Sequence, residues 1–301
     1  MTLKSAPVGW QGIVVDAPTD WSLVGVNGDA KKGYFRVDSP VASALEVKWE
    51  RVSGKPDLMA KAREFLSKID KSASKKKLKF DKDIKPDRSD DCSVRFLWRS
   101  DRLGQGRLVY CPQCERMILA QVISTRDENV AQTASLILDS IRDHRDDGWL
   151  DWGLYGLGFA VPPGYRIQKQ TLMSAYLALN FKKGAHSIVV ERWRLASSLL
   201  AKYDMETWYR KDAMPDVKGY RVDISPETVA GREGLKVSGR RKGLVTAVKA
   251  LAYSLTLHPY PDLLTGYVWY EPEQDSLYSI RATHSQSDQI AEKIRDLIIA
   301  T

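Results

Sequence analysis

Short stretches of alternating apolar and polar residues recur along this chain of 301 residues. In residues 44–52, Leu45, Val47 and Trp49 fall on one side of an extended backbone and charged residues fall on the other, which predicts a half-buried strand. Three further stretches are similarly rich in β-branched and aromatic residues: 93–99, 106–110 and 116–125. Tight turns separate these strands, which favours an antiparallel sheet.

Apolar residues at helical spacing, rather than in alternation, predict one helix in the first half of the chain. Apolar residues there recur at the spacing of a single helix face: Leu58, Ala62, Phe65, Leu66 and Ile69. Asp57 precedes them, and its carboxylate can accept hydrogen bonds from the first free backbone N–H groups. We therefore expect a helix that begins at Asp57 and ends in the lysine-rich stretch that follows Ile69.

The stretch from Gly106 to Ile141 occurs a second time at the end of the chain. A shift of 160 positions places Tyr110 on Tyr270 and Pro112 on Pro272 without a gap. The apolar positions of the closing helix coincide as well. This repeat predicts that the two halves share one order of elements.

These patterns together predict an α+β fold made of two tandem repeats, each an antiparallel sheet covered by helices. His144 to Gly148 is short, charged and ends in glycine, so it is the best linker in the chain. We place the first unit at residues 1–147 and the second at residues 148–301.

The order of elements resembles the PsbP-like fold family. That family includes the PsbP subunit of photosystem II, the bacterial lipoprotein DcrB and a Ran-binding nuclear-import factor. The resemblance begins at Pro18-Thr-Asp-Trp21 in the first half and at Pro162-Pro-Gly-Tyr165 in the second, passes through Trp49 or Trp193, and ends at the closing helix. It implies a role in binding or assembly and carries over no catalytic residue. The tandem copy and the Cys111-Pro-Gln-Cys114 turn depart from the family's pattern.

Composition and charge narrow the classes of function. The net charge of +8 is spread over both halves, and the lysines from Lys75 to Lys79 are followed at once by Asp81 and Asp83. That distribution is typical of a mildly basic protein rather than of a domain built for nucleic acid. Membrane-spanning and export segments are not recognisable, and three cysteines do not form a disulfide framework. We expect a cytoplasmic protein without a membrane span.

The most specific local motif is the Cys111-Pro-Gln-Cys114 turn. Zinc ribbons present two thiolates in turns of this kind, whereas a dithiol oxidoreductase needs its first cysteine at a helix start. With a hairpin turn at Asp101 to Gly104, Cys92 pairs opposite Gln113, at the same end of the unit. The three thiols then predict a metal site, with zinc as the metal and Asp90 or Asp91 as fourth ligand. A disulfide that leaves one thiol free is the alternative.

Tryptophans and histidines supply the remaining candidates. Trp10 and Trp152, like Trp49 and Trp193, recur in both halves, which predicts shared core anchors. Trp98, Trp149 and Trp269 have no counterpart, and we expect them on a binding surface. The four histidines are dispersed without metal-ligand spacing, which indicates solvated or capping positions.

No acid–base pair, activated nucleophile or phosphate-binding loop is recognisable in the sequence, so we expect no enzyme. The sequence favours a non-catalytic binding or scaffold protein made of two PsbP-like units, with a protein as partner and no cofactor beyond the candidate zinc. The alternatives are a protein that binds single-stranded nucleic acid, and a metal- or redox-responsive protein that uses the Cys-Pro-Gln-Cys turn.

Overall fold

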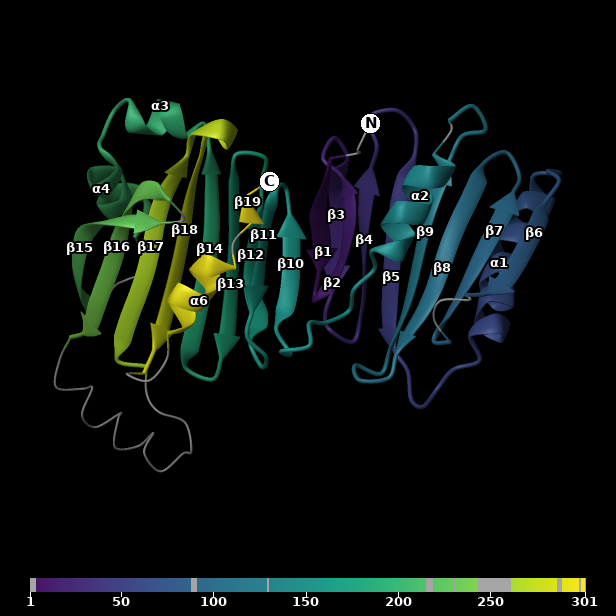
Figure 1. The fold of residues 1–301 in the computed structure, drawn as a ribbon, viewed down its shortest axis with the longest axis horizontal. Coiled ribbons are helices and arrows are strands. Elements are labelled where there is room, and N and C mark those ends of the chain that lie inside the picture. Colours follow the sequence, from purple (N-terminus) through teal and green to yellow (C-terminus); the bar gives the residue numbers. More distant parts are fainter. Residues whose placement is uncertain are drawn as a thin grey trace. The chain divides into compact units, whose positions relative to one another are not determined.

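The computed structural model shows a chain that is mostly β. It describes residues 4–87, 91–128, 130–214, 219–229, 231–242, 261–285, 289–297 and 299–300. Strands hold 52% of these described residues and helices 19%, and the strands form three antiparallel sheets. The prediction of an α+β fold with helices covering the sheets is therefore wrong, because the helices are few and mostly short (Figure 1).

The first sheet has five strands: two hairpins and the short strand β19. Its order is β19-β11-β10-β1-β2, and its strands are β1 (Ser5–Trp10), β2 (Ile13–Pro18), β10 (Leu150–Leu154), β11 (Leu157–Val161) and β19 (Ile299–Ala300). Strands β1 and β10 pair antiparallel with Gly9 opposite Gly153. A Cβ atom on Gly153 would lie 2.3 Å from the carbonyl oxygen of Pro7, so only glycine permits this approach.

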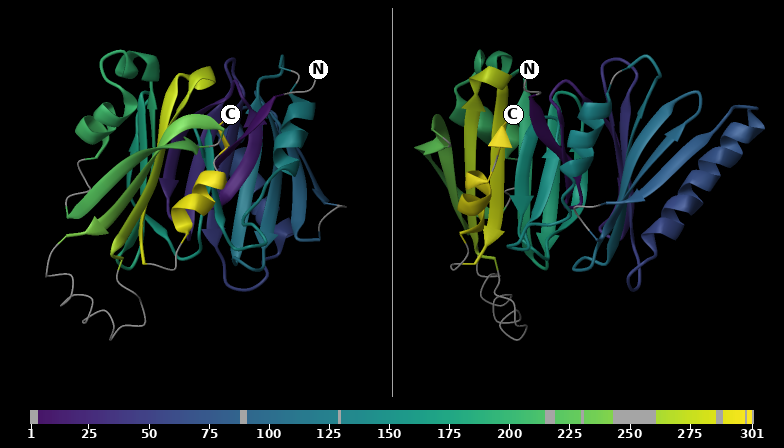
Figure 2. Two further views of the ribbon diagram at one scale, coloured as in Figure 1. Left: turned by 60° about the vertical axis from the view of Figure 1, so that its left-hand side comes forward. Right: turned by 45° about the vertical axis from the view of Figure 1, so that its right-hand side comes forward.

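The second sheet has seven strands in the order β3-β4-β5-β9-β8-β7-β6. Their bounds are β3 (Ser22–Gly28), β4 (Lys32–Asp38), β5 (Ala44–Arg51), β6 (Asp81–Pro86), β7 (Ser93–Arg99), β8 (Leu103–Cys111) and β9 (Arg116–Ser124). Helix α1 (Leu58–Lys75) lies along one face, against β6, β7 and β8 (Figure 2). Helix α2 (Ala131–Asp139) packs on β8 and β9.

Helix α1 begins where the sequence predicts. The Asp57 carboxylate caps it by accepting a 2.9 Å hydrogen bond from the backbone N–H of Ala60. Leu58, Ala62 and Leu66 are buried against the sheet, Leu66 beside Phe96 and Trp98. The helix ends at Lys75, within the lysine-rich stretch, as the sequence predicts.

The third sheet also has seven strands, in the order β12-β13-β14-β18-β17-β16-β15. Their bounds are β12 (Arg166–Leu172), β13 (Tyr176–Lys183), β14 (His186–Arg194), β15 (Tyr220–Val229), β16 (Arg232–Arg241), β17 (Leu263–Glu271) and β18 (Ser276–His284). The helical elements here are short: α3 (Ala196–Leu200), α4 (Met205–Trp208), the π-helical turn η1 (Tyr209–Ala213), the 3-10 turn η3 (Pro272–Gln274) and α6 (Ile290–Asp296).

The two seven-stranded sheets have the same strand order. A shift of 160 positions carries β8 onto β17 and β9 onto β18. Tyr110 lies opposite Met117 in the first sheet, and Tyr270 lies opposite Leu277 in the second. The two tyrosines thus hold equivalent strand positions.

The hairpin between β7 and β8 has a different register from the one predicted. Ser93 lies opposite Val109 and Trp98 lies opposite Gly104, so the turn is at Ser100 to Arg102. Gly104 belongs to the strand because the indole of Trp98 covers it: a Cβ atom there would lie 2.0 Å from Trp98 Nε1. The glycine therefore serves cross-strand packing rather than the turn.

The chain divides into two compact units, residues 1–159 and 160–300. This division falls within β11, whereas the sequence suggests a boundary between residues 147 and 148. Every helix in the described part of the chain is too short or too polar to cross a lipid bilayer.

Candidate functional site

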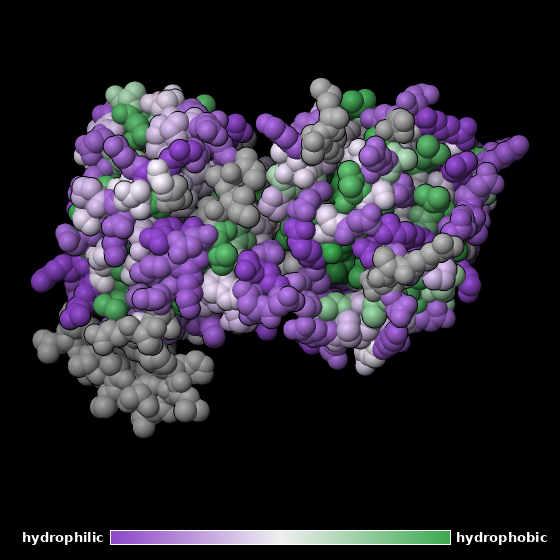
Figure 3. Space-filling model, viewed as in Figure 1, coloured by the Kyte–Doolittle hydropathy of each residue, from purple (hydrophilic) through white to green (hydrophobic). Residues whose placement is uncertain are grey.

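A groove beside α1 and a group of two cysteines and a histidine are candidate binding sites in the first unit. Hydrophilic side chains cover most of the face shown in Figure 3, with smaller apolar groups between them. The groove lies beside α1, on the face of the sheet opposite α2.

The groove has an apolar floor. It encloses about 520 Å³ between one edge of α1 and strands β4, β5, β8 and β9. Leu108, Met117 and Leu119 point from the sheet into it, and Phe65 lines it from the helix. The ring of Tyr34 stands on β4 and is 42% exposed. An exposed aromatic side chain in a groove with an apolar floor is typical of a surface that binds another molecule.

Charged side chains of both signs form the rim of the groove. The cations are Lys32, Lys48, Lys61 and Lys68, and the anions are Glu50 and Glu64. On α1, Glu64 accepts a 2.8 Å hydrogen bond from Lys68 and lies 3.6 Å from Lys61. These partners lower the pKa of the Glu64 carboxyl. Most of the rim cations thus have an acidic neighbour.

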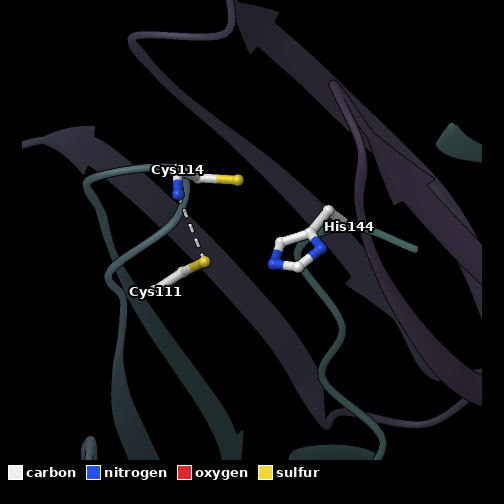
Figure 4. Close-up of side chains that lie close together, drawn as sticks. All are labelled: Cys111, Cys114 and His144. Atoms are coloured by element: carbon white, nitrogen blue, oxygen red, sulfur yellow. Dashed lines mark hydrogen bonds between the residues drawn. The ribbon is translucent and has the colours of Figure 1, made fainter. Parts of the chain in front are cut away.

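The second feature joins the Cys-Pro-Gln-Cys turn to the segment after α2. Cys111 ends β8, Cys114 lies in the turn, and His144 approaches from the segment before β10 (Figure 4). The two sulfurs and a ring nitrogen of His144 lie within 4.8 Å of one another. All three residues are at least partly buried, and both thiols are free.

The turn has a defined backbone. Pro112 follows Cys111, and the N–H of Cys114 donates a 3.4 Å hydrogen bond to Cys111 Sγ. Glu115 then adopts a left-handed conformation at φ 50°, which returns the chain into β9. The second unit builds the same turn without sulfur, with Glu271 and Gln274 in place of the cysteines and Asp275 at φ 45°.

Long-range contacts hold His144 next to this turn. Arg142 and Val14 exchange two backbone hydrogen bonds of 2.9 Å each, which ties the segment to β2. The buried Arg116 guanidinium forms an ion pair with Asp143 and donates a 2.9 Å hydrogen bond to the carbonyl oxygen of Gln11. His144 follows directly, so its position is fixed by its neighbours.

Asp143 also affects the electrostatics of the cluster. Burial raises the pKa of the Cys114 thiol to about 12, and the Asp143 carboxylate contributes to the shift. The Asp143 side chain is only 7% exposed; it pairs with Arg116 and also interacts with the Cys114 thiol.

Of the three cysteines predicted to act together, the structure brings two together. The N–H of Tyr110 donates to the carbonyl oxygen of Cys92, so Cys92 lies opposite Tyr110 and not opposite Gln113. Side chains opposite each other share a face of a sheet, and Cys111 points to the other face. Cys92 is accordingly not in the group. Asp90 lies outside the described residues, and Asp91 is exposed.

Two of the three tryptophans predicted to form a binding surface are buried in the core instead. Trp98 is 7% exposed and stacks on Phe80, and Trp269 is 1% exposed and stacks on its cross-strand neighbour Tyr278. Both belong to the core, because each indole packs against a neighbouring aromatic ring. Only Trp149 is partly exposed.

Sequence reasoning missed His144 and the groove. His144 lies 30 positions after Cys114, so no ligand spacing reveals it. The one sequence feature that could have drawn attention to His144 is its position in the charged linker before β10.

Comparisons with known proteins give little information about the function. No family model and no curated protein matches the chain. Among solved structures, the immunity protein TplEi of the T6SS from Pseudomonas aeruginosa, complexed with an "L" peptide, is 11% identical over 94% of this chain and 98% of that one, with a TM-score of 0.34. DynU16, a putative protein in the dynemicin biosynthetic locus, is 10% identical over 91% of this chain and 82% of that one, with a TM-score of 0.14. At these values neither similarity bears on fold or function.

Proposed function

We propose that this chain is a non-catalytic binding protein and that the groove beside α1 receives a segment of a partner protein. The observation that carries the proposal is the exposed Tyr34 side chain among the residues that line a groove of about 520 Å³ with an apolar floor. A space of that size accommodates several side chains of a bound segment. A binding role is also what the resemblance to the PsbP-like family implies.

The charges on the rim favour a polypeptide over a nucleic acid. The phosphodiester backbone of a nucleic acid is bound by cationic side chains that are not already paired with carboxylates. Here Glu64 lies between Lys61 and Lys68, and Glu46 lies 3.5 Å from Lys48. A peptide carries charges of both signs and can match such a rim. Nucleic acid is therefore the second candidate and an outcome of the test.

Cross-linking can identify the partner. A photo-reactive amino acid at position 34 is expected to capture a protein, whereas the same residue at Tyr203, an exposed site in the second unit, is not. The captured protein is then purified and its affinity measured. Tyr34→Ala is expected to weaken binding by about 10-fold to 30-fold because it removes an aromatic contact, and Lys68→Glu by about 10-fold because it reverses a charge on the rim. Both side chains are exposed, so neither change threatens the fold.

Two results would contradict this assignment. Unchanged affinity in both variants, with the Tyr203→Ala control also unchanged, would exclude the groove. If instead the purified chain binds a single-stranded oligonucleotide with steep salt dependence, and Tyr34→Ala weakens that binding, the nucleic-acid function is correct.

A further inference from the structure

We propose that Cys111, Cys114 and His144 bind one zinc ion, through the two sulfur atoms and the Nε2 atom of the imidazole. This site is independent of the groove. It would join the β8–β9 turn to the segment after α2, two parts of the first unit that are 30 residues apart in the sequence.

The distances suit zinc. Zinc–sulfur bonds of about 2.3 Å and zinc–nitrogen bonds of about 2.0 Å in a tetrahedron separate the ligand atoms by roughly 3.5–3.8 Å. The three ligand atoms already lie within 4.8 Å of one another, so small side-chain movements complete the geometry. Two thiolates and an imidazole are ligands that zinc prefers over harder cations such as magnesium and calcium. The fourth position would be left to water.

The histidine is oriented as a ligand. Its Nδ1 atom lies 3.2 Å from the carbonyl oxygen of Arg145, which accepts a hydrogen bond when the ring proton is on Nδ1. That tautomer leaves the lone pair on Nε2, and Figure 4 shows a ring nitrogen of His144 turned toward the two cysteines. A hydrogen bond from the other ring nitrogen to a carbonyl is the usual support of a metal-binding histidine.

The turn is also suited to a thiolate. The N–H of Cys114 points at Cys111 Sγ over 3.4 Å, and an N–H donor stabilises negative charge on sulfur. The same turn in the second unit shows that the backbone does not depend on the cysteines, since Glu271 and Gln274 replace them there. The thiols are thus an addition to a turn that forms without them.

Asp143 adds negative charge beside the two sulfurs. Its side chain is 7% exposed, pairs with Arg116 and interacts with the Cys114 thiol. Binding of zinc would displace the thiol proton, and the positive charge of the ion would then offset the thiolate next to this carboxylate.

The test uses the purified full chain in a reducing buffer. We expect one equivalent of zinc per chain by elemental analysis, and cobalt(II) in its place should show the absorption bands of thiolate-bound tetrahedral cobalt. Cys111→Ser, Cys114→Ser and His144→Gln should each weaken zinc binding by at least about 100-fold, because losing a residue that merely orients a ligand already costs about 10-fold to 100-fold. Cys92→Ser is the matched control and should bind zinc as the natural chain does.

Thermal unfolding provides a second readout. Zinc should raise the midpoint of the natural chain and of Cys92→Ser but not of the three ligand variants, since binding to the folded state stabilises it. Less than a tenth of an equivalent of zinc in the reduced natural chain would overturn the proposal. So would equal losses in Cys92→Ser and Cys111→Ser, or full zinc affinity in His144→Gln. A Cys111–Cys114 disulfide that persists when zinc is added under reducing conditions would also overturn it.

Discussion

Replacing Arg116 with methionine is expected to lower the free energy of unfolding of the first unit by about 3–5 kcal/mol. The guanidinium is 5% exposed in its side chain and forms an ion pair with Asp143, whose side chain is 7% exposed. It also donates hydrogen bonds to the carbonyl oxygens of Gln11, at 2.9 Å, and of Asp143, at 3.1 Å. Methionine would leave a buried carboxylate without its cation and two carbonyl groups without their donor.

The measurement is urea denaturation followed by tryptophan fluorescence and circular dichroism. Arg142→Ala is the control, because Arg142 also pairs with an aspartate, Asp16, but both side chains are exposed. An exposed pair contributes about 1 kcal/mol or less. The double variant Arg116→Met/Asp143→Leu should be more stable than Arg116→Met alone, because it removes both buried charges. Equal losses in Arg116→Met and Arg142→Ala would show that the buried pair has no special role.

Local patterns in the sequence predict the individual elements well. The alternation around Trp49 and the helix face that contains Leu66 depend on nearest neighbours, and both appear as β5 and α1. The cap at Asp57 is confirmed for the same reason. Such signals report which residues become buried within one element.

The fold class was wrong because helical periodicity does not report how far a helix extends. The stretch from Asp204 to Met214 forms only the four-residue α4 followed by the π-helical turn η1. The closing helix is likewise short in both halves, nine residues in α2 and seven in α6. Strands outnumber these helices, so the sheets dominate the architecture.

The sequence predicts Cys111 and Cys114 as site residues but not His144, because the position of His144 depends on strand register and on long-range contacts. Glycine is common in turns, but Gly104 lies in β8, where it packs beneath Trp98. The resulting register of β7 and β8 places Cys92 away from the Cys-Pro-Gln-Cys turn. His144 reaches the turn through the pairing of Arg142 with Val14 and of Asp143 with Arg116. Neither interaction has a local sequence signal.

Trp10 and Trp152 were predicted to be core residues in two similar units, and they are buried, but in a single shared pair. Trp10 and Trp152 are buried, at 1% and 3% exposure, as expected of core anchors. They are not equivalent members of two separate cores, however. With Gly9 opposite Gly153, they face each other across β1 and β10 and form one edge-to-face pair with ring centroids 4.9 Å apart.

Because of this pair, substitutions of Trp10 should also change the free energy of unfolding strongly. Trp10→Ala is expected to destabilise the first unit by about 3–5 kcal/mol, because it removes a fully buried ring and leaves a cavity beside Trp152. Trp10→Phe should cost considerably less, about 1–2 kcal/mol. Phenylalanine keeps an aromatic ring against Trp152, and it removes the Trp10 Nε1 donor, which is buried and has no hydrogen-bond partner among the described residues.

Urea denaturation of the two variants beside Val41→Ala tests the argument. Val41 is 79% exposed in the same unit, and its truncation should change the free energy of unfolding by no more than about 0.5 kcal/mol. If Trp10→Phe is as destabilising as Trp10→Ala, the indole N–H has a partner that stabilises the fold, and the pair does not owe its stability to ring packing alone. If Trp10→Ala is as mild as Val41→Ala, the sheet formed by β1, β2 and β10 is held by its backbone hydrogen bonds and not by the tryptophan pair.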